Sequence, residues 1–211
     1  MSQYYYTVST LPLLSLETER FLDVHDFIAL CAGELSPADF ALLLEASIEP
    51  DPEGSPEAEG SSGDYASETG GPDASGRQTL RLWVSWERAL RNELVKLRAQ
   101  RLAVDGGRYL AEASFVPGVF EVAREAVGAE TPLEGEAVLD RARWGKLDEL
   151  ETGHYFDVVK ILLYSLRLQI LGRRAQRTTE RGRTSFDALY GAIRDESQPE
   201  DFVEIMQESE E

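Results

Sequence analysis

The sequence predicts a mainly α-helical, bundle-like domain of about six to seven helices, interrupted by a disordered acidic insertion. Three observations support this: apolar residues recur every three or four positions, helix-start patterns precede several such stretches, and 42% of the 211 residues are hydrophobic. We expect an N-terminal helical segment packed on the main domain, a disordered acidic linker, the main helical domain and an acidic tail, at residues 1–48, 49–76, 77–195 and 196–211.

The N-terminal segment contains one ambiguous element and two predicted helices. Residues 4–9 favour a β-strand by propensity, although a short helix would also fit. Asp23 is expected to cap a helix with Phe27 and Cys31 on one face. Ser36 is expected to cap the next helix, because the proline that follows it suits the first helical position.

Residues 49–76 have the composition of a disordered linker. They hold eight acids, no bases, six glycines, five serines and four prolines, and Tyr65 is their only sizeable apolar side chain. Such a segment cannot bury enough apolar surface to offset the entropy lost on ordering.

A long amphipathic helix is predicted over residues 79–104. Its Trp83, Trp86, Leu90 and Leu94 recur at spacings of three or four, while arginines and a lysine occupy much of the remaining surface. An Asp-Gly-Gly sequence then favours the end of the helix.

Further helices are expected toward the C-terminus. A helix over residues 117–127 is predicted to begin at its proline, and Thr131 begins a capping box for a helix that reaches about residue 151. The helix over residues 155–176 is so apolar that it is expected to be buried on most sides. A short helix near residues 186–194 precedes the tail.

The formal net charge of −18 is distributed unevenly along the chain. Residues 1–76 carry a net −14, residues 77–183 carry +4, and residues 184–211 carry −8. The overall charge opposes binding to nucleic-acid phosphates and to anionic lipid head groups. The acidic ends either cover the basic middle or leave it to steer a partner.

The sequence is typical of a cytoplasmic protein. Its single cysteine, Cys31, cannot form an internal disulfide, and its first residues show neither the basic nor the apolar region of a signal peptide. The most apolar stretch, residues 158–171, is too short to span a bilayer and contains charged residues.

No sequence pattern indicates a reactive centre, so we expect no catalytic residue, cofactor or metal. There is no phosphate-binding loop, dinucleotide fingerprint or nucleophile elbow. His25 and His154 lack a partner at metal-ligand spacing, although the acids beside His25 leave a metal there as a minor alternative. The acids at residues 148–151 are interpreted as a solvated helix face, and a carboxylate-based enzyme is the remote alternative.

Three patches of the sequence are more specific than its composition. Residues 4–12 read Tyr-Tyr-Tyr-Thr-Val-Ser-Thr-Leu-Pro; residues 90–99 contain Leu-Arg-Asn-Glu-Leu followed by Arg-Ala; residues 155–170 begin Tyr-Phe-Asp-Val and continue through Tyr164 and Gln169. Together they resemble a family of uncharacterised bacterial proteins typically encoded within V-type (A/V-type) ATPase operons. That family has a Y-Y-Y-x-V-S-S-L-P opening, an L-R-N-E-L…R-A helix and a similar late helix.

The late helix is also similar to the final helices of the V-type ATPase C (or d) subunit family, whose all-helical members cap the membrane rotor ring and seat the central shaft. The resemblance implies a non-catalytic accessory or central-stalk subunit that links rotor ring and shaft. Its expected partners are other V-type ATPase subunits, without nucleic acid or direct membrane insertion. It would be cytoplasmic and peripheral to the inner membrane through its complex.

An assembly factor or regulator that binds the ATPase transiently is the alternative. Within the predicted long helix, Arg91 and Asn92 could serve a buried hydrogen-bond network or an interface, or could simply face solvent. The candidate interface or motif residues implied by the resemblance are Tyr4, Tyr5, Tyr6, Leu11, Pro12, Leu90, Arg91, Asn92, Glu93, Leu94, Arg98, Tyr155, Phe156, Tyr164 and Gln169.

Overall fold

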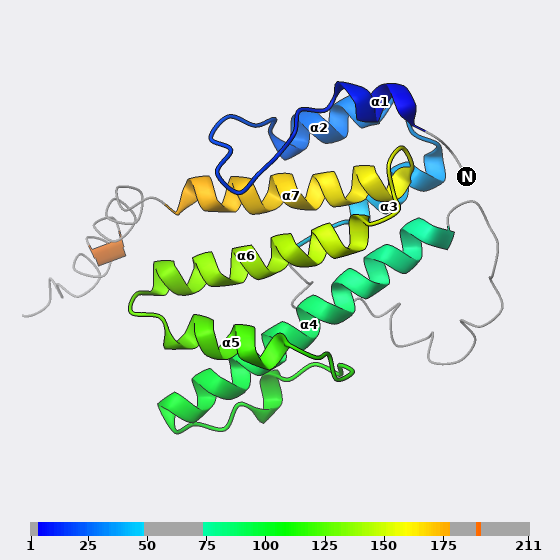
Figure 1. Cartoon of the computed structure of the whole chain (residues 1–211). Helices are drawn as coiled ribbons and strands as arrows, with labels where there is room; N and C mark the ends of the chain where they lie inside the picture. The colour runs from blue at the N-terminus through cyan, green and yellow to red at the C-terminus, as the bar shows by residue number, and fades with distance from the viewer. Residues whose placement is uncertain (1–3, 49–73, 178–188, 191–211) are drawn as a thin grey trace, which may run out of the picture. The chain divides into compact units, whose positions relative to one another are not determined.

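A computed structural model of the chain describes residues 4–48, 74–177 and 189–190 (Figure 1). These residues are mainly helical, as predicted, and contain no strand. Their longer elements are the α-helices α1 (Tyr5–Thr10), α2 (Val24–Cys31), α3 (Pro37–Glu45), α4 (Ala74–Leu102), α5 (Val119–Gly128), α6 (Pro132–Glu151) and α7 (Val158–Gln176), with a 3₁₀-helix η1 (Gly107–Tyr109).

The chain divides into two compact units, residues 1–172 and 173–211. The first unit holds the N-terminal segment together with most of the predicted main domain, so these two predicted parts form one unit. The boundary falls inside the last turns of α7 rather than at residue 195. In the second unit, the described residues are the end of α7 and the helical, exposed Leu189 and Tyr190.

Helix α7 lies at the centre of the first unit. Figure 1 shows it running between α1 and α2 on one side and α6 on the other. From Val158 to Leu171, every residue except Lys160 and Gln169 is buried. Burial of a large aliphatic side chain contributes roughly 1.5–3 kcal/mol before the entropy cost is subtracted. The prediction that this helix is buried on most sides is therefore confirmed.

Residues 4–9 are helical, so the expectation of a strand is wrong and the short-helix alternative is correct. The backbone N–H of Val8 donates to the Tyr4 carbonyl at 3.0 Å, which closes a helical turn. The N–H of Tyr4 donates to the Phe156 carbonyl at 2.6 Å. A strand would need a ladder of backbone bonds to a neighbouring strand. Within the described residues, the backbone of this segment bonds the backbone of another segment only at Phe156.

The predicted helix starts at Asp23, Ser36 and Thr131 are confirmed. The Asp23 carboxylate accepts from the His25 backbone N–H at 2.8 Å, and the Ser36 hydroxyl accepts from the Asp39 backbone N–H at 3.2 Å. Thr131 and the glutamate three residues later make both hydrogen bonds of a capping box. These contacts satisfy amide groups that the first helical turn leaves unpaired.

Helix α4 begins five residues earlier than predicted, within the stretch assigned to the linker. Its residue Gly76 is buried, and a Cβ placed there would lie 3.1 Å from a methyl carbon of Leu42 and 3.2 Å from one of Val158. The glycine therefore permits close packing of α4 against α3 and α7. The composition around this glycine had indicated a linker. In the structure, its lack of a side chain allows the helices to pack closely.

Two other helices begin later than predicted. Pro117 does not open α5; the helix starts at Val119 after Gly118, whose φ of 81° lies in the left-handed region. Helix α7 starts at Val158 rather than at residue 155, because Asp157 caps it: the Asp157 carboxylate accepts from the Lys160 backbone N–H at 3.3 Å.

Some sequence predictions fall outside the described residues. These are the disorder of residues 49–73, most of the helix near residues 186–194, and the tail at residues 196–211. Among the described helices, none combines the length and the apolar character needed to cross a membrane.

Candidate functional site

The hydroxyl of Tyr4 ties α1 to the start of α3. It donates to the Asp39 carboxylate and accepts from the Ser36 backbone N–H at 3.2 Å. The Ser36 hydroxyl donates to the same Asp39 oxygen at 3.0 Å. Asp39 is almost fully buried, and these donors replace the water lost at one of its two carboxylate oxygens.

Gln169 and Arg91 fix the chain that leaves α3. The Gln169 amide donates to the Ala46 carbonyl at 2.7 Å and accepts from the Ile48 N–H at 3.0 Å. Arg91 donates to the Ile48 carbonyl at 3.0 Å and to Glu87 at 3.1 Å. The 46–48 segment, whose Ala46 and Ile48 are buried, is thereby bound to both α7 and α4.

Asn92 holds the connection between α4 and α5. Its amide donates to the Ala111 carbonyl at 2.7 Å, and its carbonyl oxygen accepts from the Ala111 N–H at 3.0 Å. Arg91 and Asn92 thus both hydrogen-bond the backbone of neighbouring segments, but both residues are half-buried, so these bonds do not form a buried network.

The other motif residues divide between the core and the surface. Leu90, Leu94 and Tyr164 are buried, and the Tyr164 ring packs on Phe27 with centroids 5.1 Å apart. Burial raises the pKa of the Tyr164 phenol. Leu11 is half-buried, Pro12 and Arg98 are exposed, and Glu93 pairs with Lys96 at 2.6 Å.

The remaining motif residues form an aromatic surface, which we define as Tyr5, Tyr6, Tyr155 and Phe156. The rings of Tyr5 and Phe156 contact each other with centroids 4.6 Å apart. Tyr6 is 75% exposed and Tyr155 is 71% exposed. Residues from α1 and from the turn before α7 thus present aromatic groups to solvent beside a direct backbone bond between the two segments.

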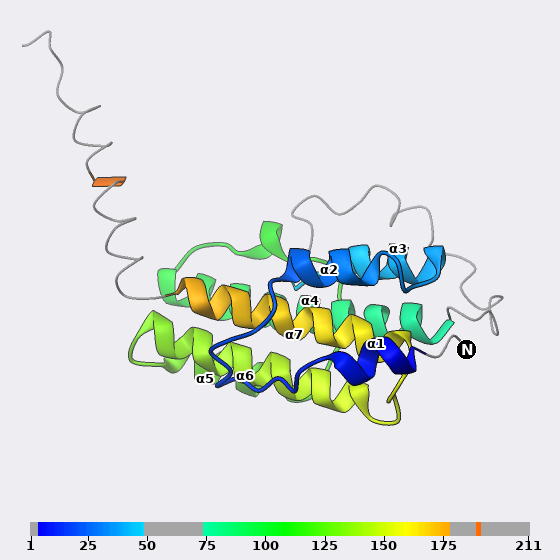
Figure 2. The same cartoon turned by 90° about the horizontal axis from the view of Figure 1, so that it is seen from above.

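A second exposed apolar surface lies on the connection between α4 and α5, and we call it the 103–118 loop surface. Phe115 is 90% exposed there, and Tyr109 is also exposed. In Figures 1 and 2 this green segment lies on the side of the first unit away from α1. The Asn92 side chain holds this loop in place.

Sequence reasoning missed a buried ionic cluster between α4 and α6. Arg143 binds Glu87 through Nε at 3.0 Å and Nη2 at 2.8 Å, and lies 3.5 Å from Asp140. The side chains of all three are at most 4% exposed. Burial opposes the charge on Arg143, but the Glu87 hydrogen bonds and the surrounding carboxylates outweigh it and raise its pKa. The spacing of Glu87 could have indicated this cluster, because Glu87 falls among the apolar positions of α4.

A second ionic network, also missed, joins α6 to α7. Arg167 donates to Asp148 and Glu151, each at 2.6 Å, and its guanidinium lies 5.5 Å from the Trp144 ring centroid. Lys160 also pairs with Glu151. Two of the acids that were interpreted as a solvated face therefore connect these helices.

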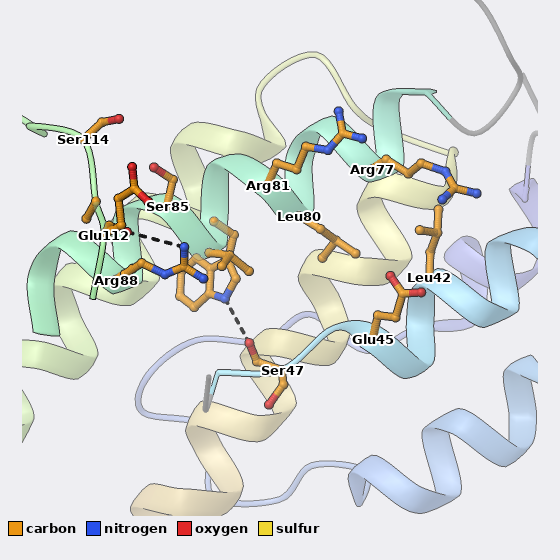
Figure 3. Close-up of a pocket in the computed structure, with 13 residues that line it drawn as sticks. Leu42, Glu45, Ser47, Arg77, Leu80, Arg81, Ser85, Arg88, Glu112 and Ser114 are labelled. Carbon is orange, nitrogen blue, oxygen red and sulfur yellow. Dashed lines mark hydrogen bonds between the residues drawn. The ribbon is translucent and has the colours of Figure 1, made fainter. Parts of the chain in front are cut away.

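A groove of about 660 Å³ runs along α4. Figure 3 shows Arg77, Arg81 and Arg88 along it, with Ser47 on the opposite side. The Trp83 indole donates to the Ser47 carbonyl at 3.2 Å. The other lining residues are Leu42, Glu45, Leu80, Val84, Ser85, Glu112, Ala113 and Ser114.

Taken together, these features define a helical protein whose loops are bound by specific side chains and whose described surface includes exposed aromatic groups. In the described part of the chain, no cluster of three or more histidine, cysteine or acidic residues could hold a metal ion. Burial raises the pKa of the Cys31 thiol to about 11, and the nearby Glu34 adds to the shift, so this cysteine remains protonated at neutral pH.

Residues 73–197 match the family model described as "Protein of unknown function (DUF2764)". The match covers more than half of the chain, and the chain belongs to this family. It includes the second and third motif patches but not residues 4–12. No curated protein and no solved structure matches the chain.

Proposed function

We propose that the chain is a non-catalytic accessory or central-stalk subunit of a V-type ATPase, similar in role to the C/d subunits that link rotor ring and shaft. The resemblance of three sequence patches supports this proposal. The observation that carries it in the structure is that the first and third patches meet, through the Tyr4–Phe156 backbone bond and the Tyr5–Phe156 ring contact.

The aromatic surface has the chemistry of a partner-binding site. Tyrosine and phenylalanine are enriched at protein interfaces, because their rings bury large areas with few rotatable bonds. Two of the four side chains are more than two-thirds exposed, so they contribute little to the core. A partner that covers them would gain the burial energy that this fold leaves unused.

The experiment is affinity purification of the tagged full-length chain from its native membranes under gentle lysis, with quantified subunit ratios. We expect near-stoichiometric recovery of the catalytic head and rotor subunits. The variant Tyr6→Ser/Tyr155→Ser should lose one of these two sets of subunits while keeping its helical circular dichroism.

The matched control is Leu133→Ser, which changes an exposed apolar residue at the start of α6. It should purify with the same subunits as the unmodified chain. Absence of ATPase subunits from the unmodified preparation would overturn the proposal.

The alternative is an assembly factor or regulator that binds the ATPase transiently. The uneven charge of the chain favours this alternative. Complementary charges speed the encounter of two proteins, and their attraction weakens as salt is raised. Substoichiometric recovery that falls steeply as salt is raised would support this alternative over a fixed subunit.

A further inference from the structure

We propose that the groove along α4 binds the acidic segment 49–73 of the same chain. Its recognition element is the arginine stripe, which we define as Arg77, Arg81 and Arg88. This inference stands apart from the ATPase proposal, because it concerns contacts within one chain.

The arginine stripe follows one face of α4. Its residues are separated by four and seven positions, which at 100° per residue places them within about 40° of one another around the helix. At 1.5 Å per residue, the stripe is about 16 Å long. All three side chains are exposed, and Figure 3 shows them emerging from the same helix beside the groove.

Two residues of the stripe make few contacts with the described part of the chain. Within it Arg77 has no ion pair, and the one hydrogen bond of Arg88 is to the Glu112 backbone carbonyl at 3.5 Å. The carboxylates that line the groove, Glu45 and Glu112, come from α3 and from the loop before α5 rather than from α4. An acidic ligand would therefore contact the α4 side of the groove.

Segment 49–73 matches this surface in charge and in position. It contains eight acids and no base. Ser47, which precedes it by two residues, lines the groove, and Ala74, which follows it, opens the helix that carries the stripe. Twenty-five extended residues span at most about 80–90 Å, so the segment can reach every arginine of the stripe.

Tethering favours this occupant over an acidic segment of another protein. A short flexible connection gives an effective concentration in the millimolar range. A single exposed ion pair contributes little to binding, so docking depends on several weak pairs and falls as salt is raised. On this proposal, an acidic part of the chain covers the basic middle and does not leave it free to steer a partner.

Cross-linking of the full chain tests the contact directly. In the variant Arg77→Lys/Arg81→Lys/Arg88→Lys the charge is kept, and a carbodiimide can join each new amine to a touching carboxylate. We expect links to acids of residues 49–73. The built-in positive controls are links within the native pairs Lys96–Glu93 and Lys146–Glu149, whose charged atoms lie 2.6 and 2.9 Å apart.

Links from the new lysines only to Glu45 and Glu112 would overturn the proposal. Links between isotopically labelled and unlabelled copies would overturn it too, because they would assign the acidic ligand to a second chain.

A binding measurement keeps the proposal testable if the lysine variant misfolds. In a full-length variant, the acids of residues 49–73 are replaced by their amides, and a fluorescent peptide of the natural segment is added. We expect saturable binding that weakens at least tenfold when the arginine stripe is reversed to glutamate, and weaker binding to the unmodified chain.

The control for this measurement reverses three exposed arginines elsewhere, namely Arg98, Arg124 and Arg141. Equal weakening by the control and the stripe reversal would contradict specific docking, as would failure of the peptide to bind the neutralised chain.

Discussion

A single amide side chain determines the path of the chain as it leaves α3. Gln169 bonds both the carbonyl of Ala46 and the N–H of Ile48, and these two residues are at most 5% exposed. Water cannot easily replace either bond, so each backbone group depends on this side chain. Residue identity therefore matters more at Gln169 than its half-buried position suggests.

Replacing Gln169 with leucine should destabilise the fold by about 2 kcal/mol or more. The change leaves two buried backbone groups without partners, and each such group costs roughly 1–3 kcal/mol. Urea unfolding followed by circular dichroism measures the loss. Gln169→Glu keeps the acceptor for Ile48 but places an oxygen against the Ala46 carbonyl, so it should also destabilise the fold. A loss well below about 1 kcal/mol in Gln169→Leu, the least that one such group costs, would contradict this account.

At the scale of elements, local sequence predicted helix starts well where the start depends on neighbouring residues. The caps at Ser36 and Thr131 involve contacts three residues apart, which a sequence displays directly. The start of α4 depends instead on Gly76 packing against Leu42 and Val158. Because those contacts come from distant parts of the chain, composition alone suggested a linker.

The candidate site was predictable to a similar degree. The motif patches identified Tyr5 and Phe156, but not that their rings touch, since they are far apart in the sequence. The arginine stripe was not predicted, because the predicted helix began at residue 79 and so excluded Arg77. Its groove was not predicted either, because Ser47 and Glu112 reach it from other segments.

The α6–α7 connection makes a prediction about acid stability. Burial tends to raise the pKa of Glu151, but hydrogen bonds and charge from Arg167 and Lys160 outweigh burial and lower it below its usual 4.5. A carboxyl whose folded pKa is lowered stabilises the fold above its unfolded pKa, and this stabilisation is lost as pH falls through the folded value.

The free energy of unfolding of Glu151→Gln should therefore be lower than that of the unmodified chain at pH 7. The difference should begin to shrink as pH falls below about 4.5, because the carboxyl of the unfolded chain is protonated first, and it should be lost once pH is below the lowered pKa of the folded chain. Urea titrations at a series of pH values measure both chains. Glu149→Gln is the control. The Glu149 side chain is exposed, so its ion pair with Lys146 should contribute little to stability. A gap that widened toward acid would contradict this sign.

At the scale of the whole molecule, an adapter between two partners needs two surfaces that can be occupied at once. The aromatic surface and the 103–118 loop surface both belong to the first unit, and they lie on different sides of it in both views. Each is bound to the core by a motif side chain, through Tyr4 to Asp39 and through Asn92 to Ala111. The arrangement suits the proposed link between rotor ring and shaft.

If the chain links two sets of subunits, variants of the two surfaces should fail in different ways. Tyr6→Ser/Tyr155→Ser should lose one set from the purified complex and keep the other, whereas Phe115→Ser should show the converse pattern. Phe115 is 90% exposed, so its replacement removes a contact surface without opening the core. Quantified subunit ratios from parallel purifications make the comparison. Loss of the same subunits in both variants would instead indicate one continuous interface, and a chain that binds through one interface would be a regulator rather than a link.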